Sequence, residues 1–156
     1  GNNNAYCQDD ETSWLDWSRL QQHRDIVRFT RGMIAFRRAH PILSEERFYT
    51  DAEIHWFGSQ GGSPNWADPK EKQFACLIHE DEQRALWLMF NAGADPVVFG
   101  MPAVPPGARW HLVVDTSREA PRDLFAAGEE QLLADPRTYQ LSPRASAILL
   151  ARATRG

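Results

Sequence analysis

Residues 86–90, Leu86-Trp87-Leu88-Met89-Phe90, place leucine and phenylalanine on one side of the chain and tryptophan and methionine on the other. Successive side chains of a β-strand point to opposite faces of a sheet, so this alternation predicts a strand. Further short strands are expected on both sides of the stretch, at residues 53–57, 74–78, 97–99, 109–114, 138–141 and 145–151. The chain is therefore predicted to consist mainly of β-strands.

Short connections separate these strands. Proline and glycine supply turns, as at residues 105–107, and the polar run Glu80-Asp81-Glu82-Gln83-Arg84 predicts the connection of a hairpin. Between Asp123 and Ala134 we expect one or two helical turns. Closely spaced strands with such turns favour an antiparallel β-sandwich.

One long helix is predicted ahead of the sandwich, between Ser18 and His40. Its apolar residues recur every three or four positions, at Ile26, Phe29, Met33 and Phe36, with Val27 and Ile34 widening the stripe. Pro41 ends the helix because it forces the preceding residue out of the α region. A stripe of this width must pack against something, and either the sandwich or a partner domain would serve.

Composition narrows the functional classes. The chain has 156 residues, 42% of them hydrophobic, and a formal net charge of −4, which indicates a globular protein and disfavours a nucleic-acid partner. No apolar run is long enough to span a bilayer and no signal segment opens the chain, so we expect a cytoplasmic location without a membrane partner. Cys7 and Cys76, the two cysteines, are expected to stay reduced. The chain lacks an initiator methionine, so it is expected to be a piece of a longer protein.

Residues that could carry chemistry are scattered. The five histidines have no spacing suited to a metal, and we expect neither a metal nor a cofactor. Asp9, Asp10, Glu11 and Asp16 could in principle supply the two carboxyl groups of a glycosidase. A loop gives such groups no rigid support, so solvated charges are the favoured interpretation.

The tryptophans divide by position. Trp87 and Trp110 lie in alternating strands and are predicted to be core residues. Trp66 lies in the Gly- and Pro-bearing loop between residues 58 and 69, and Trp56 precedes that loop. Flat aromatic rings stack on the apolar faces of pyranose sugars, so Trp66 and Trp56 are a possible sugar-stacking surface.

Two runs resemble a known family. Gly1-Asn2-Asn3-Asn4-Ala5-Tyr6-Cys7-Gln8-Asp9-Asp10-Glu11, with Trp14 and Asp16-Trp17, resembles the segment after the eighth barrel strand of bacterial glycogen debranching enzymes and isoamylases, in the α-amylase superfamily of glycoside hydrolases. The run Phe29 to Pro41 resembles the final barrel helix of the same enzymes. Weaker matches continue in order to residues 144–146. The chain departs from the family at Asp10, Gly32 and Phe36.

The resemblance implies a division into the loop and final helix of a catalytic barrel, residues 1–43, and a C-terminal β-sandwich with its connecting segment, residues 44–156. It also implies a parent enzyme that hydrolyses α-1,6 branch linkages of glycogen with retention of configuration, using carboxylates that precede Gly1. Asn4, Tyr6 and Asp9 would then either contact or support the sugar beside the cleavage point or order the loop that carries them.

By this resemblance the fragment has no catalytic residue and stabilises the barrel, its missing partner. It meets glycogen or another branched α-glucan through that barrel. The alternatives are a free-standing carbohydrate-binding module that stacks sugar on Trp56 or Trp66, and a plain structural domain.

Overall fold

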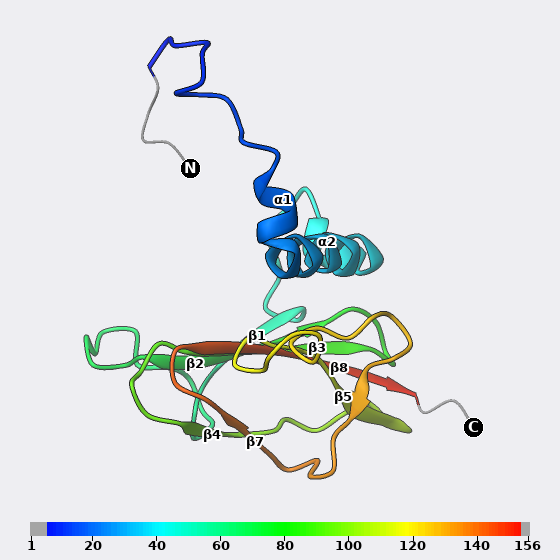
Figure 1. Cartoon of the computed structure of the whole chain (residues 1–156). Coiled ribbons are helices and arrows are strands. Elements are labelled where there is room, and N and C mark those ends of the chain that lie inside the picture. Colours follow the sequence, from blue (N-terminus) through cyan, green and yellow to red (C-terminus); the bar gives the residue numbers. More distant parts are fainter. Residues whose placement is uncertain (1–5, 154–156) are drawn as a thin grey trace.

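The computed structural model describes residues 6–153, which form two β-sheets and a helix in three layers (Figure 1). The larger sheet lies in the middle, with the helix on one face and the smaller sheet on the other. The helical elements are α1 (Arg19–Gln22), α2 (Arg24–Ala39) and the 3-10 helix η1 (Pro41–Ser44). The strands are β1 (Ile54–Gly58), β2 (Gln73–His79), β3 (Ala85–Asn91), β4 (Val97–Gly100), β5 (Ala108–Asp115), β6 (Gln131–Leu132), β7 (Thr138–Leu141) and β8 (Ala145–Ala153).

Both sheets are antiparallel. The six-stranded sheet has the order β1-β2-β3-β8-β5-β6, and β4 pairs with β7 in the second sheet. The mainly β, sandwich-like fold predicted from the sequence is therefore confirmed.

Strand β3 explains why residues 86–90 are apolar on both sides. Trp87 and Met89 point into the core between the two sheets, whereas Leu86 packs in a second core on the helix side. Trp87 is 1% exposed and Trp110 is 2% exposed, as predicted for core tryptophans. A strand covered on both faces needs apolar residues on both.

The helix packs on this chain's own sheet. Phe29, Met33 and Phe36 of α2 lie against the helix-side core, which contains Cys76 and Leu86. Of the two partners left open by the sequence, the sheet therefore covers the stripe. The single helix predicted from Ser18 to His40 is instead two helices, because His23 leaves helical geometry with φ −115° and ψ 37°.

The segment between Asp123 and Ala134 contains no helix, so the prediction of helical turns there was wrong. Leu124 forms a bridge with Val114, and β6 pairs with His111 and Leu112. The exposed edge of β5 offers backbone groups to this segment. The amide of Phe125, for example, donates to the carbonyl of Val113 at 2.9 Å. These ladder hydrogen bonds replace the ones that a helical turn would form.

Polar contacts attach α2 at both of its ends. Arg28 donates to Asp123 at 2.6 Å, and the side chains are 35% and 15% exposed. After the C-terminal end of α2, the buried carboxylate of Glu80 lies 2.8 Å from Nδ1 of His40 and 2.7 Å from Arg84. The helix is therefore fixed to the β5–β6 connection and to the β2–β3 hairpin.

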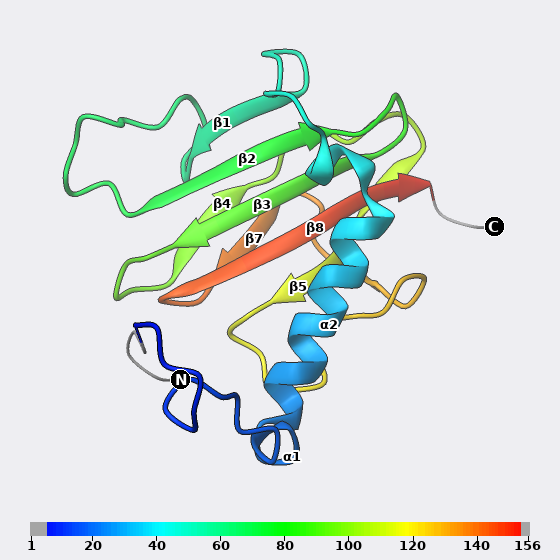
Figure 2. The ribbon, with the colours of Figure 1, turned by 90° about the horizontal axis from the view of Figure 1, so that it is seen from above.

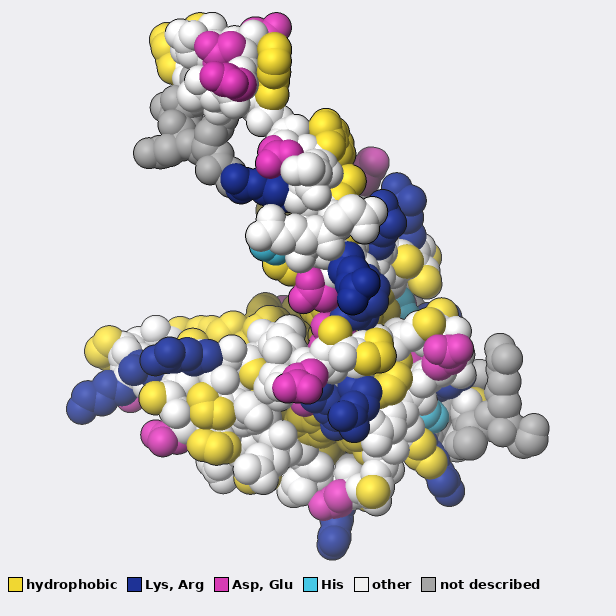
Figure 3. All heavy atoms as spheres, in the orientation of Figure 1, with side chains coloured by type: hydrophobic (Ala, Val, Ile, Leu, Met, Phe, Trp, Pro, Cys, Tyr) yellow, Lys and Arg dark blue, Asp and Glu magenta, His cyan; other side chains and the backbone are white. Residues whose placement is uncertain are grey.

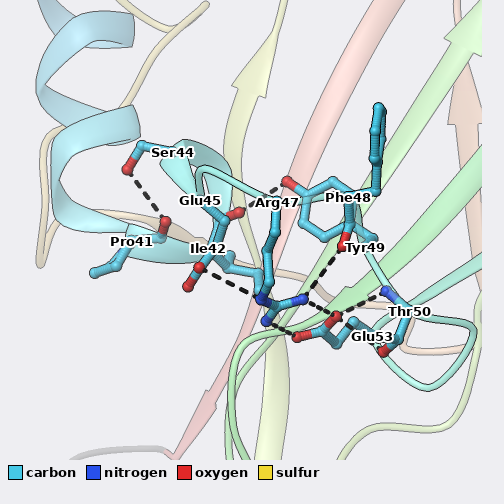
Figure 4. Close-up of polar contacts among 9 residues, drawn as sticks. All are labelled: Pro41, Ile42, Ser44, Glu45, Arg47, Phe48, Tyr49, Thr50 and Glu53. Atoms are coloured by element: carbon cyan, nitrogen blue, oxygen red, sulfur yellow. Dashed lines mark hydrogen bonds and ion pairs between the residues drawn. The ribbon is translucent and has the colours of Figure 1, made fainter.

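The segment that joins η1 to β1 is held by its own side chains (Figure 4). Arg47 pairs with Glu53, with one nitrogen–oxygen distance of 2.8 Å, and Glu53 also accepts the backbone amide of Thr50 at 2.8 Å. The Tyr49 hydroxyl donates to the carbonyl of Ile42 at 2.8 Å. These contacts fix the path from helix to sheet. The predicted domain boundary between residues 43 and 44 falls inside η1 and stays a prediction.

Candidate functional site

The amino-terminal segment, residues 6–18, extends away from the sheets (Figures 1 and 2). Asn4, one of the three predicted sugar contacts, lies outside the described residues. Tyr6 is 80% exposed, and the carboxylate of Asp9 accepts the indole N–H of Trp14 at 2.9 Å. The structure therefore ties Asp9 to Trp14 and leaves Tyr6 in solvent, and the sugar-contact role of all three residues stays a prediction.

Turns hold this segment together locally. The backbone amides of Ser13 and Trp14 both donate to the carbonyl of Asp10, at 2.9 and 3.0 Å. Figure 3 shows hydrophobic side chains beside acidic ones on the surface of its tip. Trp14, Leu15 and Trp17 are each more than 60% exposed. So much exposed apolar surface in one segment is typical of an interaction surface.

The acidic residues of this segment are poor candidates for a catalytic acid. Hydrogen bonds from Thr12 lower the pKa of Asp10, and hydrogen bonds from Ser18 lower the pKa of Asp16. A general acid in a glycosidase needs the opposite, a raised pKa that keeps the proton near neutral pH. Both groups are therefore ionised at neutral pH.

An exposed aromatic cluster is the second candidate. It consists of Trp56 on β1, Trp66 in the β1–β2 loop, Phe74 on β2 and Phe90 on β3. The ring centroids of Trp56 and Trp66 are 5.6 Å apart at an interplanar angle of 79°, and Trp66 lies 5.8 Å from Phe74. Phe74 stacks on Phe90 at 4.9 Å. The structure thus brings together the two tryptophans that the sequence singled out.

Sequence reasoning missed the two phenylalanines of this cluster. Phe74 pairs with Phe90 across the β2–β3 ladder, and Gly58 of β1 is the other neighbour of Phe74. The signal that could have found them was the alternation itself, because Phe74 and Phe90 lie at the ends of two apolar faces that were already predicted. The strand register brings them to one face of the sheet.

Buried titratable groups lie elsewhere and serve the fold. Asp115 accepts the hydroxyl of Tyr139 at 2.6 Å and that of Ser117 at 2.7 Å. Burial alone would raise the pKa of Asp115, but these hydrogen bonds outweigh it and the pKa is lowered. Among residues 6–153, no group of three or more His, Cys, Asp or Glu side chains could hold a metal ion. Within the same residues, no helix has the length and apolar character needed to cross a membrane.

Comparison with known proteins gives the chain a family. A family model described as "Isoamylase 1-3, C-terminal" matches residues 55–149, which include all of β2 to β7 and most of β1 and β8. The chain is 37% identical to Isoamylase SU1, chloroplastic, of Zea mays over 130 residues, which is 82% of this chain and 16% of that protein. It is 30% identical to an isoamylase of a Flavobacterium species over 97% of this chain and 22% of that protein.

A third relative is the glycogen operon protein GlgX homolog of Mycobacterium bovis, 32% identical over 75% of this chain and 15% of that protein. The chain therefore spans less than a quarter of the length of each of these relatives. The family match covers β1 and most of the fold that follows it. This chain belongs to the isoamylase family, and its strands form the family's C-terminal domain.

Proposed function

We propose that this chain is the C-terminal part of a debranching enzyme that hydrolyses α-1,6-glucosidic branch linkages of glycogen, or of a related α-glucan, with retention of configuration. The observation that carries the proposal is the isoamylase family match over residues 55–149. The names of the relatives support the substrate class, because they include isoamylases and a glycogen operon protein.

In this proposal the chain itself is not catalytic. The carboxylates of its amino-terminal segment are solvated, and Asp10 and Asp16 have lowered pKa values. Tyr6 and Asp9 instead belong to a loop at the mouth of the catalytic barrel, where loops that follow barrel strands contact substrate. Their role there is to contact or support the sugar.

The chain also stabilises the barrel. Three aliphatic side chains of α1 and α2 remain partly in solvent, with Leu20 40%, Ile26 60% and Ile34 48% exposed. Full burial of one such side chain against a barrel contributes about 1.5–3 kcal/mol. A partner that covers them gives the helices a second apolar neighbour in addition to the sheet.

Activity is tested by comparing this chain with the complete product of its gene on glycogen, by the release of reducing ends and of linear α-1,4 chains. The complete product should debranch glycogen and the chain alone should not. Debranching by the chain alone, or a complete product inactive on α-1,6 linkages, would refute the proposal.

The stabilising role has a matched control within the chain. Ile34 and Val98 are both 48% exposed, but Val98 lies on β4 in the smaller sheet. Ile34→Ser should lower the thermal midpoint of the complete product by more than it lowers that of the chain alone, in which Ile34 already lies beside Leu88 and Ile148. Val98→Ser should lower both midpoints by the same amount, and a difference as large for Val98→Ser as for Ile34→Ser would contradict the role of α2.

A further inference from the structure

We propose that the aromatic cluster formed by Trp56, Trp66, Phe74 and Phe90 is a binding surface for a linear segment of α-glucan. The proposal rests on the proposed function for its substrate class, and on the geometry of the cluster for its site.

The cluster lies on the uncovered part of the larger sheet. Trp56, Phe74 and Phe90 share the sheet face on which α2 packs, because their strand positions are in register with those of the helix-side core. The helix lies over β8 and β5, whereas β1, β2 and their connecting loop lie clear of it (Figure 2). The two tryptophan rings are therefore accessible in this chain, with Trp66 64% and Trp56 43% exposed, whereas Phe74 and Phe90 are half-buried.

The loop holds Trp66 in place. The amide of Asp68 donates to the carbonyl of Asn65 at 3.0 Å, which closes a turn around Trp66. The side chains of Asn65 and Asp68 strengthen this turn by accepting the amides of Ala67 and Lys70, at 3.3 and 2.8 Å. With its backbone in a turn and its ring against Trp56 and Phe74, Trp66 loses little freedom when a ligand stacks on it.

Trp66 contributes little to the core. The core tryptophans of this chain are at most 2% exposed, and Trp66 keeps about two thirds of its surface in water. An exposed tryptophan supported by other rings is typical of binding surfaces, where Trp is over-represented among the residues that carry the energy.

The chemistry of the cluster fits a sugar better than a protein. The four side chains are all aromatic, whereas the exposed apolar residues of α2, which we assign to the barrel, are the aliphatic Ile26 and Ile34. The flat C–H faces of glucose stack on aromatic rings. Asn65, Asp68 and Lys70 lie within four residues of Trp66 in the same loop and carry amide, carboxylate and ammonium groups, which can bond sugar hydroxyls.

The test measures binding of maltoheptaose, a linear α-1,4 glucan, to this chain by equilibrium dialysis and by tryptophan fluorescence. Cellohexaose, a β-linked glucan, serves as the ligand control. Maltoheptaose should bind saturably, and Trp66→Ala should weaken binding about ten-fold. Phe48→Ala is the control variant, because Phe48 is an aromatic residue 98% exposed outside the cluster, on the η1–β1 segment (Figure 4). It should change binding less than about two-fold.

Absence of saturable maltoheptaose binding overturns the proposal, as does equal weakening by Phe48→Ala and Trp66→Ala. A third result also overturns the proposal: Trp66→Ala lowers the thermal midpoint of the complete gene product but leaves glucan binding unchanged. The Trp66 ring would then contact another part of the protein and not a glucan. These outcomes are distinguishable from failure of the proposed function, which is judged by α-1,6 hydrolysis in the complete product and does not require this surface.

Discussion

Gly32 of α2 packs against Leu124 of the β5–β6 connection. Adding one methyl group at Gly32 tests how tightly the helix packs there. A Cβ atom built on Gly32 would lie 2.1 Å from Cδ2 and 3.3 Å from Cγ of Leu124. Real Cβ atoms do not approach another heavy atom so closely, so either Leu124 rotates or the helix lifts. The resemblance to debranching enzymes marked Gly32 as a departure, and this contact gives its physical reason.

Two effects of Gly32→Ala oppose each other. Alanine in a helix interior is about 1 kcal/mol more favourable than glycine. Overpacking against Leu124 costs about 1–3 kcal/mol, with the lower end favoured because the clashing atom is the end of a side chain. We expect Gly32→Ala to be neutral or destabilising by up to about 2 kcal/mol. In a Leu124→Ala background the clashing atoms are gone, so the same change should stabilise by about 1 kcal/mol.

Urea unfolding of the four chains in this double-mutant cycle, followed by circular dichroism, measures the coupling between the two positions. Arg31→Ala and Arg31→Gly, at the exposed neighbouring position of α2, give the alanine–glycine difference without a contact to Leu124. We expect a coupling energy of about 1–3 kcal/mol between the two substitutions, and we expect Gly32→Ala to stabilise the chain only in the Leu124→Ala background. If Gly32→Ala has the same effect with and without Leu124, the seating of the helix described here is wrong.

Three further predictions concern the rest of the chain. The folded-state pKa of Asp115 is below its ordinary value of 3.8, so the stabilisation by its carboxylate is complete above pH 3.8 and is lost as the pH falls further. Asp115→Asn should therefore lower the free energy of unfolding by about 1.5–3 kcal/mol at pH 7 and by less at pH 3. Urea unfolding at both pH values measures this. Trp87→Ala should destabilise by about 3–5 kcal/mol, whereas Trp66→Ala should cost less than about 1 kcal/mol; similar thermal shifts for the two would contradict their contrasting burial. Iodoacetamide should modify exposed Cys7 in the folded chain and leave buried Cys76, whose pKa burial raises to about 12, unmodified until urea is added; mass spectrometry of the peptides checks this.

The strands were predictable because burial on two faces leaves a strong local signal. Leu86 and Trp87 face different cores, and each core requires an apolar residue, so the alternation could be identified without knowing the pairing. The pairing itself was not predictable. Nothing near Val97 or Leu141 indicates that these residues face each other in a separate two-stranded sheet. Strand order depends on how all the strands share the core, which no single window of sequence contains.

The segment after β5 shows where local reasoning failed. Residues between Asp123 and Ala134, where helical turns were predicted, include alanines and leucines that tolerate a helix. The edge of β5 instead provides hydrogen-bond partners for the backbone of this segment, and Leu124 packs against Gly32 of α2. Tertiary hydrogen bonds and packing outweigh a helix preference of a few tenths of a kcal/mol per residue.

Sequence reasoning could find one residue of the candidate site but not its contacts, because only the first leaves a local signal. Trp66 was identified because a large aromatic residue in a polar loop is unusual, and that signal is local. Its contacts with Trp56 and Phe74 depend on the β1–β2 register and on the course of the loop, which are properties of the folded chain.

Two of the apolar surfaces that remain exposed, on α2 and on the aromatic cluster, differ in chemistry, and this difference argues for different partners. The exposed apolar residues of α2, Ile26 and Ile34, are aliphatic and lie on the helix whose stripe the sheet already buries, so a protein layer that covers them extends an existing core. The aromatic cluster lies on the same face of the sheet, toward β1 and the β1–β2 loop, which α2 does not cover (Figure 2). A domain seated on α2 can leave the cluster open, since α2 lies over β8 and β5. One chain can therefore contact a barrel through its helices and hold a glucan on its sheet at the same time.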